Sequence, residues 1–457
     1  MSMQKVRLLS LLLGLLPAGI GAAPPLVSVS APVTLGAPRG LHYSPDVVAL
    51  HEGYVVVWQR GQDHAGGPGA GLELQVLDAS ANPRRPVTTL CDAAGSQEHP
   101  RLASNGRQGL VVWQDFRNGH DWDVYAARLD AGGEPHPGCG LVLATGSANA
   151  ALPVAATAGR RGFLVVWQQT DDHGFYRLHA ALVPPAGKVR FLGPVLNQAP
   201  DAADWHGYTP GWGTGRQPLR AGQQDALVLT GGRAEVIETD PEGGAWFLTW
   251  HDEANWAPGN RGGITRRVAR LELRGDRLVA TAVSAAPSNG LARNEGGLAR
   301  NGDRVLLTGR SIINRGNSHV SGAILPADRL AFLPNPNTEP RKFGAGWDPS
   351  RVFSLFRAAL GMEGPVAATA FGAGFLVAAV GDSRAGSIHA RRIIGNFIDR
   401  EGRRLLVDGD WPVLHQGEAL PSHPVLAGRG KTALLVFEQR RGADRLIQAR
   451  LIRGAVP

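Results

Sequence analysis

Histidines in predicted loops are the side chains of this sequence best suited to acid–base chemistry, because imidazole gains and loses a proton near neutral pH. A neighbouring tyrosine could carry a proton, and an arginine could neutralise a substrate carboxylate. The candidates for these roles are His120, His173, His206, Tyr208, Arg216, His251 and Arg261. The alternative for each loop histidine is a solvated side chain or one that pins its own loop. Paired histidines or cysteines of the kind that hold zinc are missing from the sequence, so we expect neither a metal nor a cofactor.

A second set of residues has the types that suit sugar recognition. Flat aromatic rings stack on the apolar faces of pyranose rings, while charged and polar neighbours bond the hydroxyl groups. The candidate ligand-binding residues are Asp115, Arg117, Asp121, Trp205, His206, Tyr208, Trp212 and Trp347. The alternative for the aromatic residues between 205 and 212 is that they pack their own loop onto the fold.

These residues surround a strand pair that recurs along the chain. Within residues 100–129, GLVVW at 109–113 and DVYAARL at 123–129 indicate two antiparallel strands joined by a polar loop. The first half of this pattern returns in the segments 45–58, 100–113, 153–167, 365–379 and 424–437. Weaker copies at 244–250 and 303–309 bring the number to seven. The tryptophans that recur at one position, Trp58, Trp113, Trp167 and Trp250, are predicted to lie in the core.

Each copy continues into a third strand, and in all but the last copy a tight turn then leads to a weaker fourth strand. The turns at 130–133 and 399–402 are examples, and the fourth strands are expected at 141–143 and 405–407. A four-stranded sheet of this kind buries both of its faces only when it is stacked between others, and repeats of about 50 residues are typical of propeller blades. The sequence therefore predicts an all-β fold, a seven-bladed β-propeller of four-stranded antiparallel blades. A pair of β-sandwiches and a right-handed β-helix are the alternatives.

The two ends of the chain complement each other. The last copy stops near residue 453 without a fourth strand, and residues 26–30 form a strand that has no blade of its own. We therefore expect the N-terminal strand to close the last blade, which would leave no exposed sheet edge. Residues 24–457 are then a single propeller domain with loop insertions at about 199–233 and 334–364. Neither alternative fold predicts complementary ends.

The first 23 residues resemble a secretory signal peptide. Lys5 and Arg7 precede an apolar run, and small residues follow up to an expected cleavage site near Ala23. We therefore expect a secreted or periplasmic protein. No later segment is long and apolar enough to predict a membrane span. The chain has only two cysteines, and Cys91 and Cys139 form either a disulfide or two separately buried thiols.

The charge of the chain argues against nucleic acid as a partner. The formal net charge of +8 falls when the two basic residues of the signal leave, and the remaining arginines are scattered rather than clustered. The expected partners are instead a glycan or an extracellular protein. We expect a monomer.

The segments VVWQDFRNG at 111–119 and DVYAARLD at 123–130 resemble the repeat of exported bacterial β-propellers, VVWxDxRxG followed by DIYAxRxDxxG. The resemblance is strong in the second copy and poor in the fourth and fifth. It implies the fold and export, but this family includes carbohydrate-binding, adhesive and uncharacterised proteins, so it implies no single function. The S-x-D-x-G-x-T-W boxes of sialidases are missing.

The loops between second and third strands lie at the same end of a propeller as the connections between blades. Both insertions map to this end, as do the inter-blade histidines His42, His99, His206, His415 and His423. The second insertion is expected to contain a short helix at 352–360 that begins after Asp348 and Pro349. Insertions on one face of a repeat protein usually build its binding surface.

Three functions compete for that loop-bearing face. The leading hypothesis is a non-catalytic propeller that binds a glycan or another extracellular macromolecule. The alternative is a polysaccharide lyase or glycoside hydrolase that uses His, Tyr and Arg on the same face, and the second alternative is a protein–protein interaction scaffold. Convergence of these side chains around one deep pocket would favour the enzyme.

Overall fold

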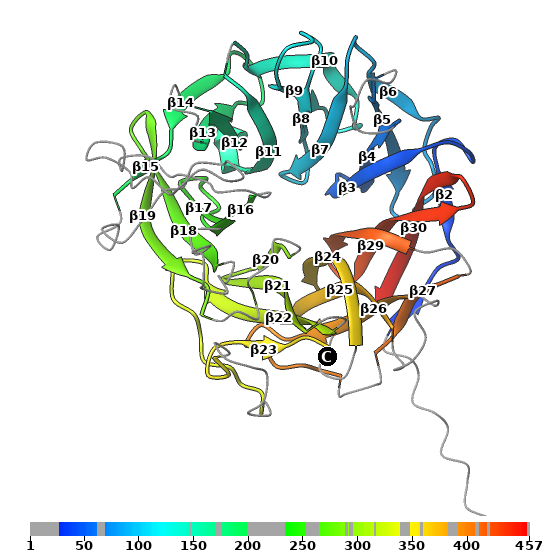
Figure 1. Cartoon of the computed structure of the whole chain (residues 1–457), viewed down its shortest axis with the longest axis vertical. Helices are drawn as coiled ribbons and strands as arrows, with labels where there is room; N and C mark the ends of the chain where they lie inside the picture. Colours follow the sequence, from blue (N-terminus) through cyan, green and yellow to red (C-terminus); the bar gives the residue numbers. More distant parts are fainter. Residues whose placement is uncertain are drawn as a thin grey trace, which may run out of the picture.

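The computed structural model of the chain describes residues 27–61, 69–146, 148–170, 176–198, 234–252, 265–287, 291, 296–314, 317–338, 348–356, 360–382, 392–406, 411–417 and 421–454. These residues form seven antiparallel sheets of four or five strands arranged in a ring, which is a seven-bladed β-propeller (Figure 1). The predicted fold is therefore confirmed. Among the described residues, no helix is long and apolar enough to cross a membrane.

The first four blades follow one another along the chain. Blade 1 comprises β3 (His42–Leu50), β4 (Gly53–Arg60), β5 (Gly71–Asp78) and β6 (Thr88–Cys91). Blade 2 comprises β7 (Gln97–Ser104), β8 (Gly109–Asp115), β9 (Asp123–Leu129) and β10 (Pro135–Ala144). Blade 3 comprises β11 (Ala150–Thr157), β12 (Phe163–Thr170), β13 (Tyr176–Val183) and β14 (Arg190–Pro194), with a short 3-10 helix at Gly159–Arg161. Blade 4 comprises β16 (Glu235–Glu238), β17 (Ala245–Asp252), β18 (Thr265–Arg274) and β19 (Arg277–Ala285), with β15 (Leu196–Asn197) added in parallel to β19.

The last three blades complete the ring. Blade 5 comprises β20 (Leu298–Asn301), β21 (Arg304–Asn314), β22 (Asn317–Pro326) and β23 (Phe353–Ser354). Blade 6 comprises β24 (Leu360–Phe371), β25 (Gly374–Asp382), β26 (Arg392–Ile398) and β27 (Val413–Gln416). Blade 7 comprises β28 (Pro421–Arg429), β29 (Thr432–Arg441) and β30 (Asp444–Gly454), to which the N-terminal strands β1 (Val27–Val29) and β2 (Val33–Leu35) are added.

The N-terminal strands close the last blade, as the sequence predicts. β1 pairs antiparallel with β30, so that Val27 lies opposite Gly454 and Val29 opposite Ile452. β2 pairs with the earlier part of the same strand. Because the outer edge of β30 is paired with a segment from the other end of the chain, the last blade is built from both ends, and backbone hydrogen bonds within it close the ring.

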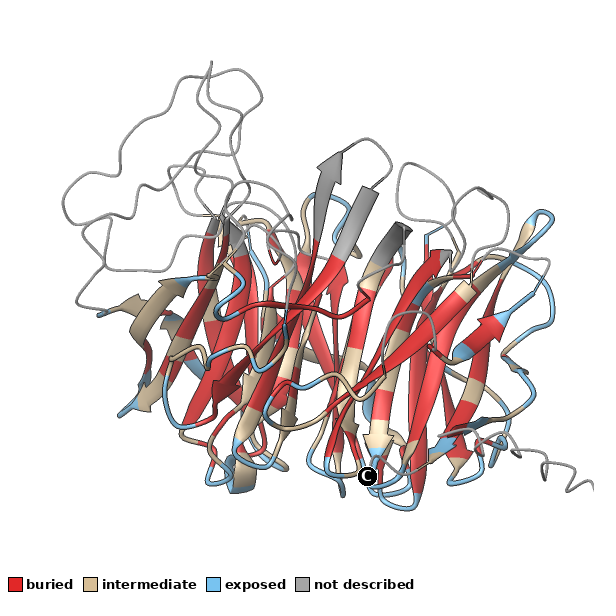
Figure 2. Ribbon diagram, turned by 90° about the horizontal axis from the view of Figure 1, so that it is seen from below, coloured by how far each residue is buried: buried red, intermediate tan, exposed pale blue. Residues whose placement is uncertain are grey.

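Every blade buries both of its faces against its neighbours. Val55 and Val57 of β4 belong to the core between blades 1 and 2, whereas Val56 and Trp58 belong to the core between blades 7 and 1. Seven such hydrophobic cores alternate with the seven blades. Figure 2 shows the resulting band of buried residues across the ring. This two-sided burial explains why the second strands are continuous apolar runs rather than alternating ones.

The repeat tryptophans lie in these cores, as predicted. Trp58, Trp113, Trp167 and Trp250 are each at most 3% exposed. A disulfide joins Cys91 at the end of β6 to Cys139 in β10, with Cα atoms 4.7 Å apart. It links the outer strands of blades 1 and 2 and closes a loop across 48 residues, which is worth about 2–4 kcal/mol of stability.

The first strands, which lie nearest the middle of the ring (Figure 1), carry a recurring β-bulge before a proline. The residue before the proline has a φ between 48° and 53° in four blades: Ser44, His99, Leu152 and His423. A left-handed conformation costs a residue other than glycine roughly 1–2 kcal/mol, so these positions need surrounding contacts to hold them.

Three of these bulges are held by a side chain from the preceding blade. In the second strand of each of these preceding blades, a glutamine or glutamate follows the recurring aromatic residue. Its side-chain oxygen accepts a hydrogen bond from the backbone N–H of the bulge residue in the next blade. The pairs are Gln59 with His99 (3.4 Å), Gln114 with Leu152 (3.2 Å) and Glu438 with Ser44 (2.8 Å). All three acceptor side chains are buried. These hydrogen bonds, which we call the blade clips, therefore fix the inner strand of one blade to its neighbour.

Two local expectations were wrong. Residues 349–351 form a turn and are followed by β23, which pairs with β22, rather than a helix over 352–360. The second insertion thus includes the fourth strand of blade 5. In blade 6, the fourth strand is β27 at Val413–Gln416 rather than the expected segment at 405–407, and Arg404 just before that segment forms only an isolated bridge with Ile398. Pairing with the exposed edge of the third strand decides the position of these short outer strands, and their own sequences specify it weakly.

Removal of a blade clip should destabilise the fold. In Gln114→Ala, the partly buried N–H of Leu152 loses its acceptor, which should lower the free energy of unfolding by about 1–3 kcal/mol in urea denaturation. Gln108→Ala, in the turn between β7 and β8, is the matched control, and its side chain makes no hydrogen bond to the described residues. Equal stability of the two variants would contradict the role of the clip.

Candidate functional site

The predicted ligand residues Asp115 and Arg117 form an ion pair inside blade 2. Asp115 ends β8 and is fully buried, and its carboxylate accepts hydrogen bonds from Trp113 Nε1 (2.9 Å) and from Arg117 Nε (2.8 Å). The guanidinium also lies over the ring of Tyr125, 3.8 Å from its centre, and donates to the carbonyl of Cys139. The Asp115 carboxylate is thus already occupied by donors of its own blade, while the Arg117 side chain stays 25% exposed.

The third residue of this loop, Asp121, stands beside a second buried carboxylate. The side-chain amide of Asn118 donates to Asp121 Oδ1 (2.5 Å) and to Asp123 Oδ2 (3.1 Å). Asp123 is 3% exposed, and burial together with the charges of Asp121 and Asp115 raises its pKa to about 6. His120 is exposed in the same loop, and its backbone N–H bonds to Asn118. The structure therefore brings Asp115, Arg117 and Asp121 together around Asp123.

The other predicted site residues cannot be placed in this way. His251 belongs to β17, where it pairs with Arg266 of β18. The remaining candidates lie outside the described residues: His173, Trp205, His206, Tyr208, Trp212, Arg216, Arg261 and Trp347. Among the described residues, no group of three or more His, Cys, Asp and Glu side chains could hold a metal ion.

A different set of polar residues converges where blade 7 meets blades 1 and 2. We call it the junction cluster, and it consists of Tyr43, Ser44, His99, His423, Glu438 and Arg445. These residues come from the starts of β3, β7, β28 and β30 and from the end of β29. First and third strands start at the end of the ring that carries the loops between second and third strands. The junction cluster therefore lies on the loop-bearing face.

Glu438 is the centre of the junction cluster. It is 1% exposed and occupies the position that holds glutamine in blades 1 and 2. Its Oε1 accepts the blade-clip hydrogen bond from the Ser44 N–H. Its Oε2 accepts hydrogen bonds from Ser422 Oγ (3.1 Å) and from Arg445 (2.7 Å). His423 Nδ1 lies 3.2 Å from the same oxygen.

These contacts keep the carboxylate of Glu438 ionised. Burial by itself would raise the pKa of Glu438, but the hydrogen bond and charge of His423, the Ser44 amide and the Arg445 guanidinium outweigh it, so the pKa lies below its usual value. A buried carboxylate with this many donors acts as a fixed acceptor that orients its neighbours rather than as a proton carrier. His423 and Arg445 are the neighbours that it orients.

The remaining residues extend this group toward blade 2. The Arg445 guanidinium lies over the ring of Tyr43, 4.5 Å from its centre, and Ser44 Oγ lies 3.5 Å from His99 Nδ1. His423 is 51% exposed, and Tyr43, Ser44, His99 and Arg445 are partly exposed. Polar groups of three successive blades thus present hydroxyl, imidazole and guanidinium groups at one place on the face.

An ion pair ties together blades that are not neighbours just beyond the bulges of these first strands. Arg101 of β7 donates to Glu235 of β16 (2.9 Å), although blade 3 stands between their blades. Arg101 also lies 3.9 Å from Asp46 of β3, whose pKa is raised by burial. Blades 1, 2 and 4 are therefore connected near the axis of the ring.

The junction cluster can accept hydrogen bonds, donate them and bind an anionic group. Because the Nδ1 of His423 faces Glu438, the opposite ring nitrogen is the one left for a ligand. Arg445 supplies a planar set of donors. The cluster thus combines several groups that can recognise a polar ligand.

Sequence reasoning found only part of this cluster. His99 and His423 were placed among the inter-blade histidines, but Tyr43, Ser44, Glu438 and Arg445 were not selected. Two signals were present: the His-Pro pairs at 99–100 and 423–424, and the change from Trp-Gln in the first three copies to Phe-Glu at 437–438. A repeat position at which one copy replaces an amide with a charge is a candidate for function.

The raised pKa of Asp123 makes stability depend on pH. The folded protein holds this proton more tightly than the unfolded chain does, so stability should fall as the pH rises from about 4 to 6. Asp123→Asn should remove this loss and be more stable than the wild type at pH 7 by about 2 kcal/mol, with the gain vanishing below pH ~4. The measurement is urea denaturation across this pH range.

The control for this measurement is Asp276→Asn, in the exposed turn between β18 and β19. The Asp276→Asn variant should follow the wild-type profile. A stability difference between Asp123→Asn and wild type that stays constant from pH 4 to 7 would refute the assignment.

No protein-family model and no curated protein matches the chain. Among solved structures, it is similar to a protein of unknown function from Dyadobacter fermentans, with 12% identity, a TM-score of 0.46, and coverage of 94% of this chain and 100% of that one. It is also similar to the polysaccharide lyase Uly1, with 10% identity, a TM-score of 0.46, and coverage of 91% and 90%. A sialidase from Trypanosoma rangeli follows with 8% identity, a TM-score of 0.40, and coverage of 94% and 60%. At these values, we transfer neither an activity nor a residue role.

Proposed function

We propose that this chain is an exported β-propeller that binds a glycan or another extracellular macromolecule through its loop-bearing face. The observation that carries the proposal is the junction cluster. It places partly exposed tyrosine, serine, histidine and arginine side chains of blades 7, 1 and 2 around the buried, ionised carboxylate of Glu438. Side chains held in this way bind a ligand with little loss of conformational freedom.

The chemistry of the cluster suits a sugar ligand. Sugar hydroxyl groups both donate and accept hydrogen bonds, and Ser44, His99 and His423 offer both kinds of partner. The bulges support this reading, because strained backbone at φ near 50° is often found where a site is built. In the first strands, these bulges direct residues of neighbouring blades to the same end of the ring.

Export is supported by the disulfide and by the predicted signal peptide. Disulfides between structural cysteines persist in oxidising compartments and are rare in the cytosol of most organisms. The bond between Cys91 and Cys139 uses both cysteines of the chain. We propose that the mature protein is secreted or periplasmic.

A glycan array read with histidine variants tests the proposed binding. In His99→Asn and His423→Asn, asparagine tolerates the left-handed backbone while the imidazole is removed. Affinity for the glycans bound by the wild type should fall by about tenfold in each variant. His51→Asn is the matched control, since His51 is exposed, has a φ of 50° and lies in the turn between β3 and β4 at the opposite end of the ring.

Two outcomes would count against this function. If the wild type binds no glycan on an array that includes acidic polysaccharides, the glycan is excluded as the ligand class. If all three histidine variants bind as the wild type does, the junction cluster is not the contact surface. Circular dichroism would confirm that the variants remain folded.

The pairing of His423 with Glu438 favours one second candidate function, a polysaccharide lyase or glycoside hydrolase. A carboxylate that holds one nitrogen of an imidazole orients the ring, as an acid–base catalyst requires. Arg445 beside it could neutralise the carboxylate of a uronate. The Tyr43 hydroxyl could carry a proton in the same region.

Ultraviolet absorbance separates the lyase from the binding protein, because lyase cleavage leaves an unsaturated uronate. For a lyase, incubation of acidic polysaccharides with the wild type should produce this absorbance, and His423→Asn should lose it while still binding. Binding by the wild type without new absorbance or new reducing ends would exclude both reactions for the polysaccharides tested.

A further inference from the structure

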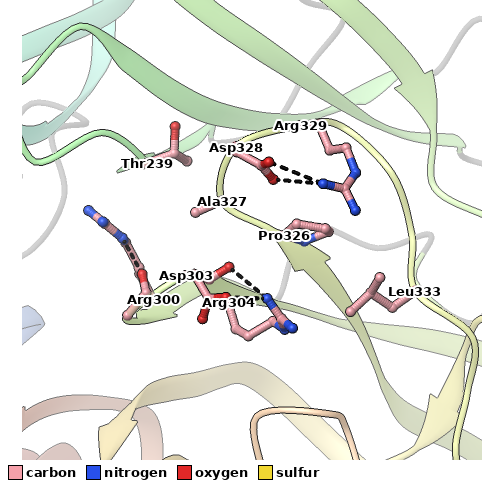
Figure 3. Close-up of a pocket in the computed structure, with 10 residues that line it drawn as sticks. Thr239, Arg300, Asp303, Arg304, Pro326, Ala327, Asp328, Arg329 and Leu333 are labelled. Carbon is pink, nitrogen blue, oxygen red and sulfur yellow. Dashed lines mark hydrogen bonds and ion pairs between the residues drawn. The ribbon is translucent and has the colours of Figure 1, made fainter.

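A cavity of about 480 Å³ lies at the other end of the ring, between blades 4 and 5 (Figure 3). Its walls are the residue after β16, the turn between β20 and β21, and the segment after β22. The connections between first and second strands, and those that follow third strands, lie at the end opposite to the loop-bearing face. The cavity is therefore separate from the junction cluster.

Three arginines line the cavity, and in each of them only some of the guanidinium N–H groups contact a carboxylate. Nη1 of Arg304 donates to Asp303 (2.6 Å), and Nη1 of Arg329 donates to Asp328 (3.1 Å). Nη1 of Arg300 lies 3.5 Å from Glu238. Within the described part of the chain, Nη2 donates no hydrogen bond in any of the three arginines. Each arginine therefore keeps donors for a ligand.

Guanidinium groups outnumber carboxylates in the ion pairs around the cavity. Arg400 of blade 6 also pairs with Asp303, so this carboxylate serves two guanidinium groups. Four arginines thus share three carboxylates in these pairs. Burial, with a smaller contribution from the charge of Asp240, raises the pKa of Glu238 to about 7 despite Arg300. A bound anion would give these guanidinium groups a further partner.

The turn that carries two of these arginines is held in place before any ligand binds. Arg300 Nε donates to the carbonyl of Gly302 (2.9 Å). The side chain of Asn301 donates to the carbonyls of Gly372 (3.2 Å) and Gly374 (2.6 Å), which belong to the first turn of blade 6. Gly302 has a φ of 61°, which a side chain would strain. The positions of Arg300 and Arg304 are therefore fixed by the backbone that lies between them.

The segment after β22 adds an apolar surface to the cavity. Pro326, Ala327 and Leu333 provide it, and Figure 3 shows them on the same segment as Asp328 and Arg329. Guanidinium groups bind carboxylate, sulfate and phosphate oxygens through paired N–H donors. The volume lies within the range of small-molecule sites, about 300–1,000 Å³, and exceeds what an inorganic ion fills.

We propose that this cavity binds a small organic oxyanion, a molecule of about the size of one sugar unit that carries a carboxylate or sulfate. The arginines take the oxyanion, and the apolar wall contacts the carbon skeleton. This inference does not depend on the proposed function, since it concerns the other end of the ring.

Titration calorimetry with glucuronate, with glucose as the neutral counterpart, tests the site. The wild type should bind glucuronate and not glucose, and the affinity should fall as salt is added. Arg304→Gln and Arg329→Gln should each weaken glucuronate binding about tenfold or more. The matched control is Arg277→Gln, an exposed arginine in the β18–β19 turn at the same end, which should bind as the wild type does.

The proposal would be overturned if the wild type bound no glucuronate at a glucuronate concentration of about 10 mM, because binding weaker than that would be too weak for a useful site. It would also be overturned if Arg277→Gln weakened glucuronate binding as much as the cavity variants do. Binding of inorganic sulfate without binding of glucuronate is the third contradicting result. If a variant fails to fold, hydrogen exchange of the wild type can replace the variant measurements. Glucuronate should protect the amides of residues 300–304 and 326–329 from exchange. His423→Asn should leave glucuronate binding intact, so failure of this site and failure of the proposed function are distinguishable.

Discussion

The structure depends on the burial of both faces of every sheet. A four-stranded blade of apolar second strands has two hydrophobic faces, and in water only another blade can cover each of them. Val55 and Val56, adjacent in β4, therefore contribute to two different cores. Seven cores between seven blades satisfy all of them only when the ring closes. The pairing of β1 with β30 provides that closure, because it joins the two ends of the chain in one sheet.

The same ring geometry creates the candidate site. Packing of blades around an axis brings the first strands close together, and the blade clips hold their bulges in a strained conformation. In blades 1 and 2, a neutral glutamine is sufficient for this task. In blade 7, Glu438 performs it with a charge and also attracts His423 and Arg445. A scaffold position has thereby become the centre of a polar cluster.

The two ends of the ring differ in how their charges are paired. At the loop-bearing face, the carboxylates of Asp115 and Glu438 are buried and surrounded by donors, so they position arginine and histidine side chains. At the other end, the exposed carboxylate of Asp303 is shared between Arg304 and Arg400. Low accessibility strengthens the first kind of pairing. Among the described residues, the second kind leaves guanidinium donors of Arg304 unused, and these donors are the basis of the inferred anion site.

The sequence by itself determined the blades, their number and the closure, because apolar runs such as GLVVW at 109–113 recur at regular spacing and depend only on local periodicity and burial. It also left the choice between a disulfide and two thiols open, and the approach of Cys91 to Cys139 decided it. The sequence indicates a helix where β23 lies and a wrong position for β27, because pairing with a neighbouring edge fixes these short outer strands rather than their own residues. Only the tertiary structure showed that Asp115 is engaged within its own blade. The contact between Tyr43 and Arg445, which are about 400 residues apart in the sequence, is also visible only in the tertiary structure, because the ring brings its first and last blades together.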